Sequence, residues 1–248
     1  MIRRLFNLGV PTLAKLRYQP SPQDRFEQIV RKYIRPHHIV LNAGCGRRAN
    51  IELKESCRIV VGTDIDTQIA ENTGIDAAVR ADLGKLPFRD KTFDLVISWW
   101  VIEHLDTPQN CFNEFARVCR DEGIVIQGTP NILNYAILVA ASTPFWFHSW
   151  FRRSILGDKH GSYPTKYKAN TPMKMKSMMT EAGFTSVEVH CLDSGPGYFR
   201  WLTPLYAVGL IYHRLISRFK WLAIFRDSII GVFRRQNPRR ESERNQAI

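Results

Sequence analysis

The sequence predicts an α/β fold built on a doubly wound, mostly parallel sheet. Apolar runs of strand length occur at residues 37–46, 58–66, 76–82, 93–100 and 123–131. Spacers of helix length separate them, and the first three runs end in glycine or acidic residues. Runs that are apolar at nearly every position indicate parallel strands covered by helices on both faces. A chain of 248 residues suits one such domain with added helices.

Three helices and a further strand complete the predicted fold. Helices are expected at 21–35, 107–120 and 172–183, the first of them with Ser21 as a side-chain cap. Residues 184–192 alternate between apolar and polar types, as in a strand with one exposed face. We therefore expect a sheet of about seven strands, with ligands bound at the carboxyl ends of the strands.

Uneven charge divides the chain into four parts. A basic helical lead-in covers residues 1–35, and the α/β domain covers 36–197 with a helical insertion at about 132–170. A basic, aromatic helical appendage follows at 198–235, and the polar tail 236–248 is expected to be disordered. The net charge of +12 lies in the two ends, because the α/β domain has 17 basic and 18 acidic residues. Basic ends are typical of chains that meet a membrane surface or a nucleic acid, and simple solubility is the alternative.

The cysteines and the first residues bear on the compartment. Five cysteines occur without a CxxC pair, which indicates free thiols in a reducing compartment, and no residue set has metal-ligand spacing. The opening residues MIRRLFNLGVPTLAK are basic and amphipathic, and no clear small-residue cleavage site follows them. We therefore expect a cytoplasmic protein with a lead-in helix rather than a signal peptide.

Two aromatic segments with neighbouring cations favour a membrane surface as partner. The longest uncharged run of the appendage, Trp201–Tyr212, is shorter than the ~20 apolar residues of a membrane span. Residues 132–151 carry no formal charge, but Asn134, Pro144 and His148 argue against a span. Both segments are suited to the interface, with cations toward anionic lipid, so we expect a peripheral protein on the inner membrane face. Core helices with a basic outer face are the alternative, and single-stranded RNA is the less favoured partner.

Two glycines and two acids follow the predicted strands at their carboxyl ends. Gly44 and Gly46 permit a sharp turn and a close approach of the backbone to a ligand. Asp64 ends the second run, 18 residues after Gly46, where a carboxylate can accept both hydroxyls of a ribose. Asp82 ends the third run and can accept a hydrogen bond from the adenine amine; a helix cap is the alternative for either acid. A dinucleotide is disfavoured, because the loop lacks a third glycine at the dinucleotide spacing.

These segments resemble a known family over about residues 36–131. VLNAGCG is similar to its glycine loop, VVGTDID to its ribose-acid strand, and RADLGKLPFRDKTFDLVISWWVIEHL to its adenine-acid segment with the following strand. The family is that of class I S-adenosylmethionine (SAM) dependent methyltransferases, in the methyltransferase type 11 group, similar to the quinone-biosynthesis C-methyltransferases. The resemblance implies a Rossmann-like fold, methyltransferase activity, SAM as cofactor and S-adenosylhomocysteine as product.

The resemblance also assigns cofactor-binding residues. The glycine loop would line the methionine and ribose, the acid of the second run would bind ribose, and that of the third would hold the adenine edge. The end of the fourth run would border the sulfonium and its methyl group. The residues are Asn42, Ala43, Gly44, Cys45, Gly46, Asp64, Ile65, Asp82, Leu83, Ser98 and Trp99.

Two positions depart from the family pattern. Asn42 replaces an acid that helps to hold the SAM ammonium, and Arg48 replaces the third glycine of the loop. An amide still forms hydrogen bonds but lacks the charge that strengthens them. These departures leave open a non-enzyme interpretation, in which the chain is a degenerate SAM-binding partner subunit.

The acceptor is expected to be hydrophobic. The added helices at about 132–170 and 198–235 would form a lid and a surface for a quinone, an isoprenoid or a lipid-like molecule. A sugar or polysaccharide precursor is the alternative acceptor. Transfer to oxygen or carbon usually needs a base, and the candidates are His104, His160 and Glu103; for each histidine a role without chemistry is the alternative.

Overall fold

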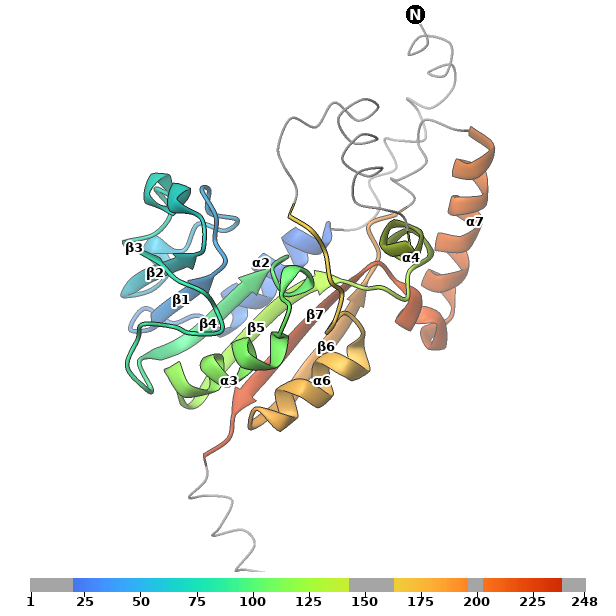
Figure 1. Cartoon of the computed structure of the whole chain (residues 1–248). Coiled ribbons are helices and arrows are strands. Elements are labelled where there is room, and N and C mark those ends of the chain that lie inside the picture. The colour runs from blue at the N-terminus through green and yellow to red at the C-terminus, as the bar shows by residue number, and fades with distance from the viewer. Residues whose placement is uncertain (1–19, 143–162, 196–202, 238–248) are drawn as a thin grey trace, which may run out of the picture.

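The computed structural model describes residues 20–142, 163–195 and 203–237, and a seven-stranded sheet forms its centre (Figure 1). The spatial order is β3-β2-β1-β4-β5-β7-β6. Strands β1 to β5 run parallel, and β7 is antiparallel to both of its neighbours, so the predicted mostly parallel α/β sheet is confirmed. The strands are β1 (Ile39–Ala43), β2 (Ile59–Asp64), β3 (Ala77–Arg80), β4 (Phe93–Trp99), β5 (Cys119–Pro130), β6 (Phe184–Leu192) and β7 (Ser228–Arg235).

The last strand corrects the predicted organisation. Residues 198–235 were expected to form a helical appendage outside the α/β domain, but Ser228–Arg235 is a strand inside the sheet. Strand β7 pairs with β5 from Ile124 to Pro130 and with β6 along its whole length. Because six consecutive residues of β7 are buried, the strand shows no alternation of apolar and polar residues and gives no strand signal of period two. The α/β domain therefore extends to residue 235.

Helices cover both faces of the sheet on its β4–β5–β7–β6 side. Helix α2 (Pro22–Tyr33) begins at the predicted cap, where the Ser21 hydroxyl accepts from the Asp24 amide and the Asp24 carboxylate accepts from Ser21. Helices α3 (Pro108–Val118) and α6 (Pro172–Glu181) lie together over the opposite face (Figure 1). All three predicted helices are confirmed, with ends shifted by a few residues.

Successive side chains of the central strands pack alternately into two separate hydrophobic cores, one on each face of the sheet. Leu41 and Val96 pack with Phe112 of α3, whereas Val40 and Leu95 pack with Phe26 and Ile29 of α2. Successive side chains of a strand point to opposite faces, so neighbouring residues of β1 and β4 enter different cores. The same alternation determines which side chains at the strand ends lie on each face of the sheet.

The connections on the other side of the sheet differ from the prediction. Helix-length spacers follow β1, β2 and β3, yet they contain only the short 3-10 helices η1 (Lys54–Ser56) and η2 (Thr67–Glu71). Buried side chains of the irregular segments, among them Ile51, Leu53 and Ile75, cover the sheet in place of an α-helix. The glycine loop after β1 therefore leads into irregular chain instead of a helix N-terminus.

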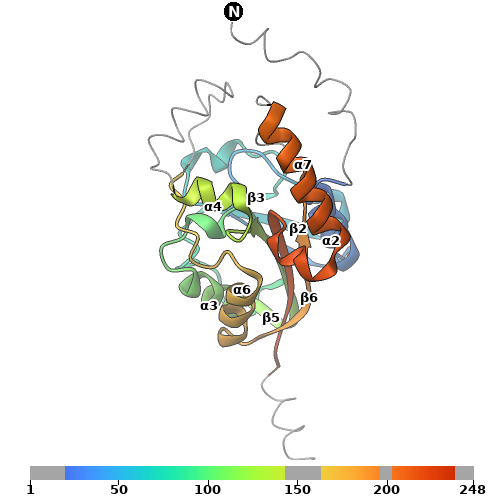
Figure 2. The ribbon, with the colours of Figure 1, turned by 90° about the vertical axis from the view of Figure 1, so that its right-hand side faces the viewer.

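Two further helices lie beyond the carboxyl ends of the strands. Helix α4 (Tyr135–Ser142) follows β5, and α7 (Thr203–Arg218) with η6 (Lys220–Phe225) precedes β7. They lie side by side in both views, and the rings of Tyr135 and Tyr212 meet edge to face at 4.6 Å (Figures 1 and 2). Within the described ranges, no helix is long and apolar enough to span a bilayer. The predicted lid is described only at its two ends, because residues 143–162 lie outside the described chain.

Candidate functional site

The glycine loop turns sharply where β1 ends. The Thr63 carbonyl of β2 accepts hydrogen bonds from the amides of Gly44 (2.7 Å) and Cys45 (3.2 Å). Gly44 has φ +72°, and a Cβ there would lie 2.3 Å from a methyl carbon of Val101. Gly46 has φ +57°, but a Cβ there would meet no atom within 4 Å. The loop thus packs tightly on its Gly44 side and is open on its Gly46 side, as a backbone cradle for a ligand requires.

Asp64 lies at the end of β2, directly beside this open cradle. One carboxylate oxygen accepts from the Gly46 amide at 2.8 Å, and the other accepts from the Asp66 amide at 2.9 Å. Each carboxylate oxygen has a further lone pair, so the fixed carboxylate can still accept two hydroxyl groups. Ile65 is 59% exposed beside it, which leaves its side chain available to a flat apolar ligand such as adenine.

Asn42 and Cys45 are both buried in this region. Asn42 is 5% exposed within β1, where a carboxylate would have to be desolvated, so the amide avoids a large cost. The Cys45 thiol packs in the core on the α2 side, and burial raises its pKa to about 11. Cys45 can therefore line a ligand through its backbone only, as can Ala43, whose side chain is buried in the α3 core.

Asp82 follows β3 and is held in a tight turn. One of its carboxylate oxygens accepts from the Gly84 amide at 2.7 Å, and the Lys85 amide donates to its carbonyl at 3.0 Å. The other carboxylate oxygen has no bond within this turn. Leu83 is buried in the α3 core, so its predicted contact with adenine remains a prediction.

Ser98 and Trp99 end β4 with side chains on opposite faces. The Trp99 ring packs against Phe26 of α2 at 4.7 Å, and a Cβ at Gly128 would lie 2.2 Å from it. Ser98 pairs in register with Ala43 and therefore faces the α3 side. The two side chains therefore cannot share one face of the sheet, and the predicted border of these two residues with the methyl group stays a prediction.

A row of buried polar side chains crosses the sheet at this level. Thr63, Ser98 and Gln127 lie on β2, β4 and β5 in register with one another through Ala43. The two hydroxyl groups and both polar atoms of the Gln127 amide have no hydrogen-bond partner among the described residues. An unsatisfied buried polar group costs roughly 1–3 kcal/mol, so such a row fits a place where water or a polar ligand approaches.

A buried carboxyl group links the turn after β4 to the end of the predicted lid. Glu103, in η3 (Ile102–His104), is 2% exposed and accepts from the Thr129 hydroxyl at 2.9 Å. The Asn170 amide donates to the same hydroxyl oxygen at 2.7 Å. The Glu103 carbonyl accepts from the amides of Lys166 and Tyr167, at 2.6 and 3.1 Å. Burial raises the pKa of the Glu103 carboxyl to about 7.

Of the two candidate histidines, the structure describes one. Nδ1 of His104 lies 3.0 Å from the Pro164 carbonyl, which selects the tautomer with the proton on Nδ1 and leaves a lone pair on Nε2. Its ring meets that of Tyr163 at 6.0 Å, and the Tyr163 hydroxyl donates to Asp66 at 3.2 Å. Residues 163–170 thus form a strap from β5 to Asp66, two residues after Asp64, and His104 contacts this strap at Pro164. His160 lies outside the described residues.

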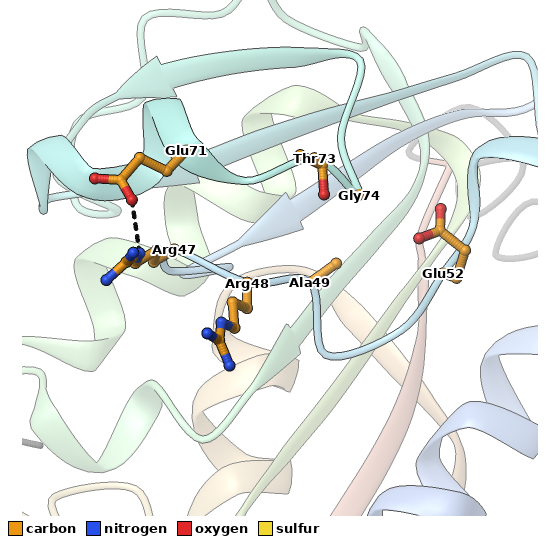
Figure 3. Close-up of a pocket in the computed structure, with 7 residues that line it drawn as sticks. All are labelled: Arg47, Arg48, Ala49, Glu52, Glu71, Thr73 and Gly74. Atoms are coloured by element: carbon orange, nitrogen blue, oxygen red, sulfur yellow. Dashed lines mark ion pairs between the residues drawn. The ribbon is translucent and has the colours of Figure 1, made fainter. Parts of the chain in front are cut away.

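A polar hollow of about 350 Å³ lies next to the glycine loop, and neither Asp64 nor Asp82 lines it. Figure 3 shows Arg47 reaching Glu71 across it, with an Nε to carboxylate distance of 2.7 Å. Both side chains are more than half exposed, so this ion pair contributes little stability. The hollow forms where irregular chain replaces a helix, and none of the predicted cofactor residues lines it. Its lining residues are Arg47, Arg48, Ala49, Glu52, Glu71, Thr73 and Gly74.

Sequence reasoning missed the polar row and the Thr129–Asn170 link. The signal available was the segment Gln127–Asn131, where polar residues end an otherwise apolar strand. Parallel strands gather such ends at one edge, so these positions could have been added to the candidate site. Asn170 gave no signal of its own, because its partner is 41 residues away.

Comparisons with known proteins agree with this geometry. Residues 41–127 match the family described as "Methyltransferase domain". A probable S-adenosylmethionine-dependent methyltransferase of Mycobacterium tuberculosis is 29% identical over 162 residues, covering 63% of this chain and 52% of that protein. A human probable tRNA methyltransferase 9B is 30% identical over 123 residues, covering 47% and 26%. Phosphoethanolamine N-methyltransferase 2 of Haemonchus contortus, solved with SAM, has a TM-score of 0.54 at 14% identity, covering 86% and 53%.

The fold is that of a class I methyltransferase. Three features define it: an antiparallel β7, a glycine loop after β1 and an acid at the end of β2. The matched family agrees with this fold: residues 41–127 match a methyltransferase domain, and the proteins that the chain resembles include SAM-dependent methyltransferases. The chain spans about half the length of the M. tuberculosis relative, 52%.

Proposed function

We propose that this protein transfers a methyl group from SAM to a hydrophobic or membrane-associated acceptor, such as a quinone, an isoprenoid or a lipid-like molecule. The observation that carries the proposal is the open cradle at Gly46 with Asp64 fixed beside it. The match of residues 41–127 to methyltransferase domains supports the reaction class.

The residues at the strand ends fit SAM. Asp64 would accept the ribose hydroxyls, Asp82 would accept from the adenine amine, and the Gly44–Gly46 backbone would border the methionine part. SAM carries no phosphate, so a loop that lacks a helix N-terminus after it can still hold this cofactor. When bound, SAM supplies an electrophilic methyl group on a sulfonium, and S-adenosylhomocysteine is the product.

His104 is the described side chain best suited to remove a proton from the acceptor. The Pro164 carbonyl orients its ring, and Nε2 keeps its lone pair in the neutral form. The strap of residues 163–170 would exclude water above the acceptor, and Glu103 would hold that strap in position through Thr129. Alignment of acceptor and methyl group would then supply much of the rate.

Apolar surface around the carboxyl edge supports a hydrophobic acceptor. Trp100 is 45% exposed after β4, and Leu138 of α4 is 51% exposed after β5. A sugar or polysaccharide acceptor would call for a polar wall on these elements. A tRNA acceptor is the second candidate, favoured by the relative described as a tRNA methyltransferase and by the basic charge of the chain.

Calorimetric titration with SAM tests the cofactor. Asp64→Ala should weaken SAM binding about 100-fold or more, because it removes charge-assisted hydrogen bonds to two hydroxyls. Asp121→Asn is the control, since Asp121 pairs with Lys91 on the surface and lies away from the carboxyl edge. A folded wild-type protein that binds no SAM would refute the proposal.

A labelled-methyl assay tests the acceptor. The wild-type protein is offered a membrane lipid extract, a polysaccharide fraction and bulk tRNA, and the labelled product is analysed by mass. We expect label in the lipid extract only and none with Asp64→Ala. Label in tRNA or polysaccharide would overturn the acceptor class but not the reaction. A protein that binds SAM yet labels nothing would support the degenerate subunit instead.

A further inference from the structure

Helix α7 presents two different sides. Tyr206, His213 and Ile216 are buried against the domain, whereas Val208 and Ile211 are 62% and 61% exposed. Leu215 continues the exposed stripe at 48%. A spacing of three and four residues places these side chains on one helical face. Figure 2 shows α7 along the outside of the molecule, next to α4.

The inner side of α7 and the following η6 are firmly attached to the sheet. The Asn131 amide, directly after β5, donates to the carbonyls of Ile224 and Arg226, both at 2.7 Å. The Tyr212 hydroxyl donates to the Phe225 carbonyl at 2.8 Å, and His213 pairs with the buried Asp193 carboxylate. These contacts fix the orientation of α7, so its apolar stripe is presented to solvent by a well-anchored helix.

Cations lie beside the exposed stripe, and α7 and η6 themselves contain no acid. From Thr203 to Phe225 the sequence contains no Asp or Glu and three Lys or Arg residues. Helix η6 adds Trp221, which is 74% exposed. We call this surface the α7 face; its exposed residues are Val208, Ile211, Arg214, Leu215, Arg218, Phe219, Lys220, Trp221 and Phe225.

We infer that the α7 face docks onto the surface of an anionic lipid bilayer. Exposed aliphatic and indole side chains beside cations match the headgroup region, where apolar groups are buried and cations meet lipid phosphates. A second copy of the chain would bring like charges together. RNA bases could stack on the aromatic rings but would leave the aliphatic stripe of Val208, Ile211 and Leu215 in water, whereas a bilayer buries both. Because α7 lies at the carboxyl edge of the sheet, docking would turn the candidate site toward the bilayer. The inference deepens the proposed function by naming the membrane as a partner of the protein. It rests on the proposed function only where it places a hydrophobic acceptor in that membrane.

Vesicle flotation of the full chain tests the inference. The probes are vesicles of pure phosphatidylcholine and vesicles with about three parts phosphatidylcholine to one part phosphatidylglycerol, at low salt. The charge variant carries Arg214→Gln, Arg218→Gln and Lys220→Gln. Its matched control carries Arg58→Gln, Lys85→Gln and Arg89→Gln, which remove three exposed cations elsewhere.

The apolar variant carries Val208→Gln, Ile211→Gln and Trp221→Gln. Its control is Met173→Gln, which changes a 71% exposed side chain on α6. All the changed positions are exposed, so the variants should keep the wild-type fold. Calorimetry with SAM, run on every variant, reports the candidate site separately from the α7 face.

Wild type should bind the anionic vesicles and not the neutral ones. The charge variant should bind about 100-fold more weakly, since each Lys or Arg near an anionic surface contributes roughly fivefold. The apolar variant should lose about tenfold or more, and both controls should bind as wild type does. Absence of wild-type binding, or α7-face variants that bind as tightly as their controls, would overturn the inference. Vesicle binding without SAM binding would leave the inference standing and defeat the proposed function.

Discussion

Replacing Glu103 by glutamine removes a buried ionisation while keeping the shape of the side chain. The carboxyl group is 2% exposed and bonded to Thr129, and burial raises its pKa from 4.5 to about 7. An amide oxygen at the same place can still accept from Thr129. Glu103→Gln therefore imitates the protonated acid at every pH.

The sign and size of the effect follow from proton linkage. A carboxyl whose pKa is raised by folding contributes stability that is fully present below the unfolded pKa and lost as pH rises through the folded pKa. This stability is lost in the pH range between the two pKa values, from 4.5 to about 7. The difference between these two pKa values corresponds to roughly 3 kcal/mol. Between about pH 5 and about pH 8, the unfolding free energy of wild type should therefore fall by a few kcal/mol relative to that of Glu103→Gln.

Urea unfolding followed by circular dichroism at a series of pH values measures this difference. His104 Nε2 lies 3.9 Å from the Glu103 carboxylate, and Tyr167 also lies near it. Both proteins are therefore compared in a His104→Asn background, which removes the nearest second titrating group. Glu181→Gln, an exposed acid at the end of α6, is the control and should run parallel to wild type. If the unfolding free energies of the protein with Glu103 and of Glu103→Gln, both in the His104→Asn background, change in parallel with pH, the reasoning is refuted.

Three glycine substitutions test the packing around the site. Gly44→Ala should lower stability by about 2–4 kcal/mol in urea unfolding, because it combines a positive φ with a clash against Val101. Gly46→Ala should lower the unfolding free energy by only about 1 kcal/mol. It should weaken SAM binding at least tenfold by calorimetry, because its Cβ enters the open cradle. Equal effects of Gly44→Ala and Gly46→Ala on stability and on SAM binding would contradict the distinction between a packed and an open side of the loop. Gly128→Ala should destabilise by about 1–3 kcal/mol through overpacking on Trp99, and an unchanged melting temperature would show that the indole moves away freely.

Local patterns predicted the part of the fold that carries the cofactor. The strands that end at Ala43, Asp64 and Arg80 lead directly to the glycine loop, to Asp64 itself and to Asp82. Each signal lies within about ten residues of sequence, and the parallel topology brings their ends together without further information. The glycine loop and its two acids could therefore be placed at one edge of the sheet from the sequence alone.

The features that were missed depend on contacts between distant residues. Strand β7 is buried between β5 and β6 and ends in Arg234 and Arg235, so its composition matched a basic helix as well as a strand. Its identity as a strand follows from pairing with Ile124–Pro130, about 100 residues earlier in the chain. The absence of an α-helix after β1 is equally non-local, since Ile51 and Leu53 replace helix packing only because β1 and β2 lie beneath them.

A rule that the sequence itself contains distinguishes the two residues predicted at the end of β4. Ser98 and Trp99 are neighbours on a strand, so their side chains must point to opposite faces, and only one can share a face with Ala43. The residue on that face is Ser98, which continues in register to Gln127 and leaves the indole to pack on Phe26. Ser98 is therefore the side chain at the end of β4 that shares a face with Ala43, and the unsatisfied amide of Gln127 next to it offers both a donor and an acceptor to the same space.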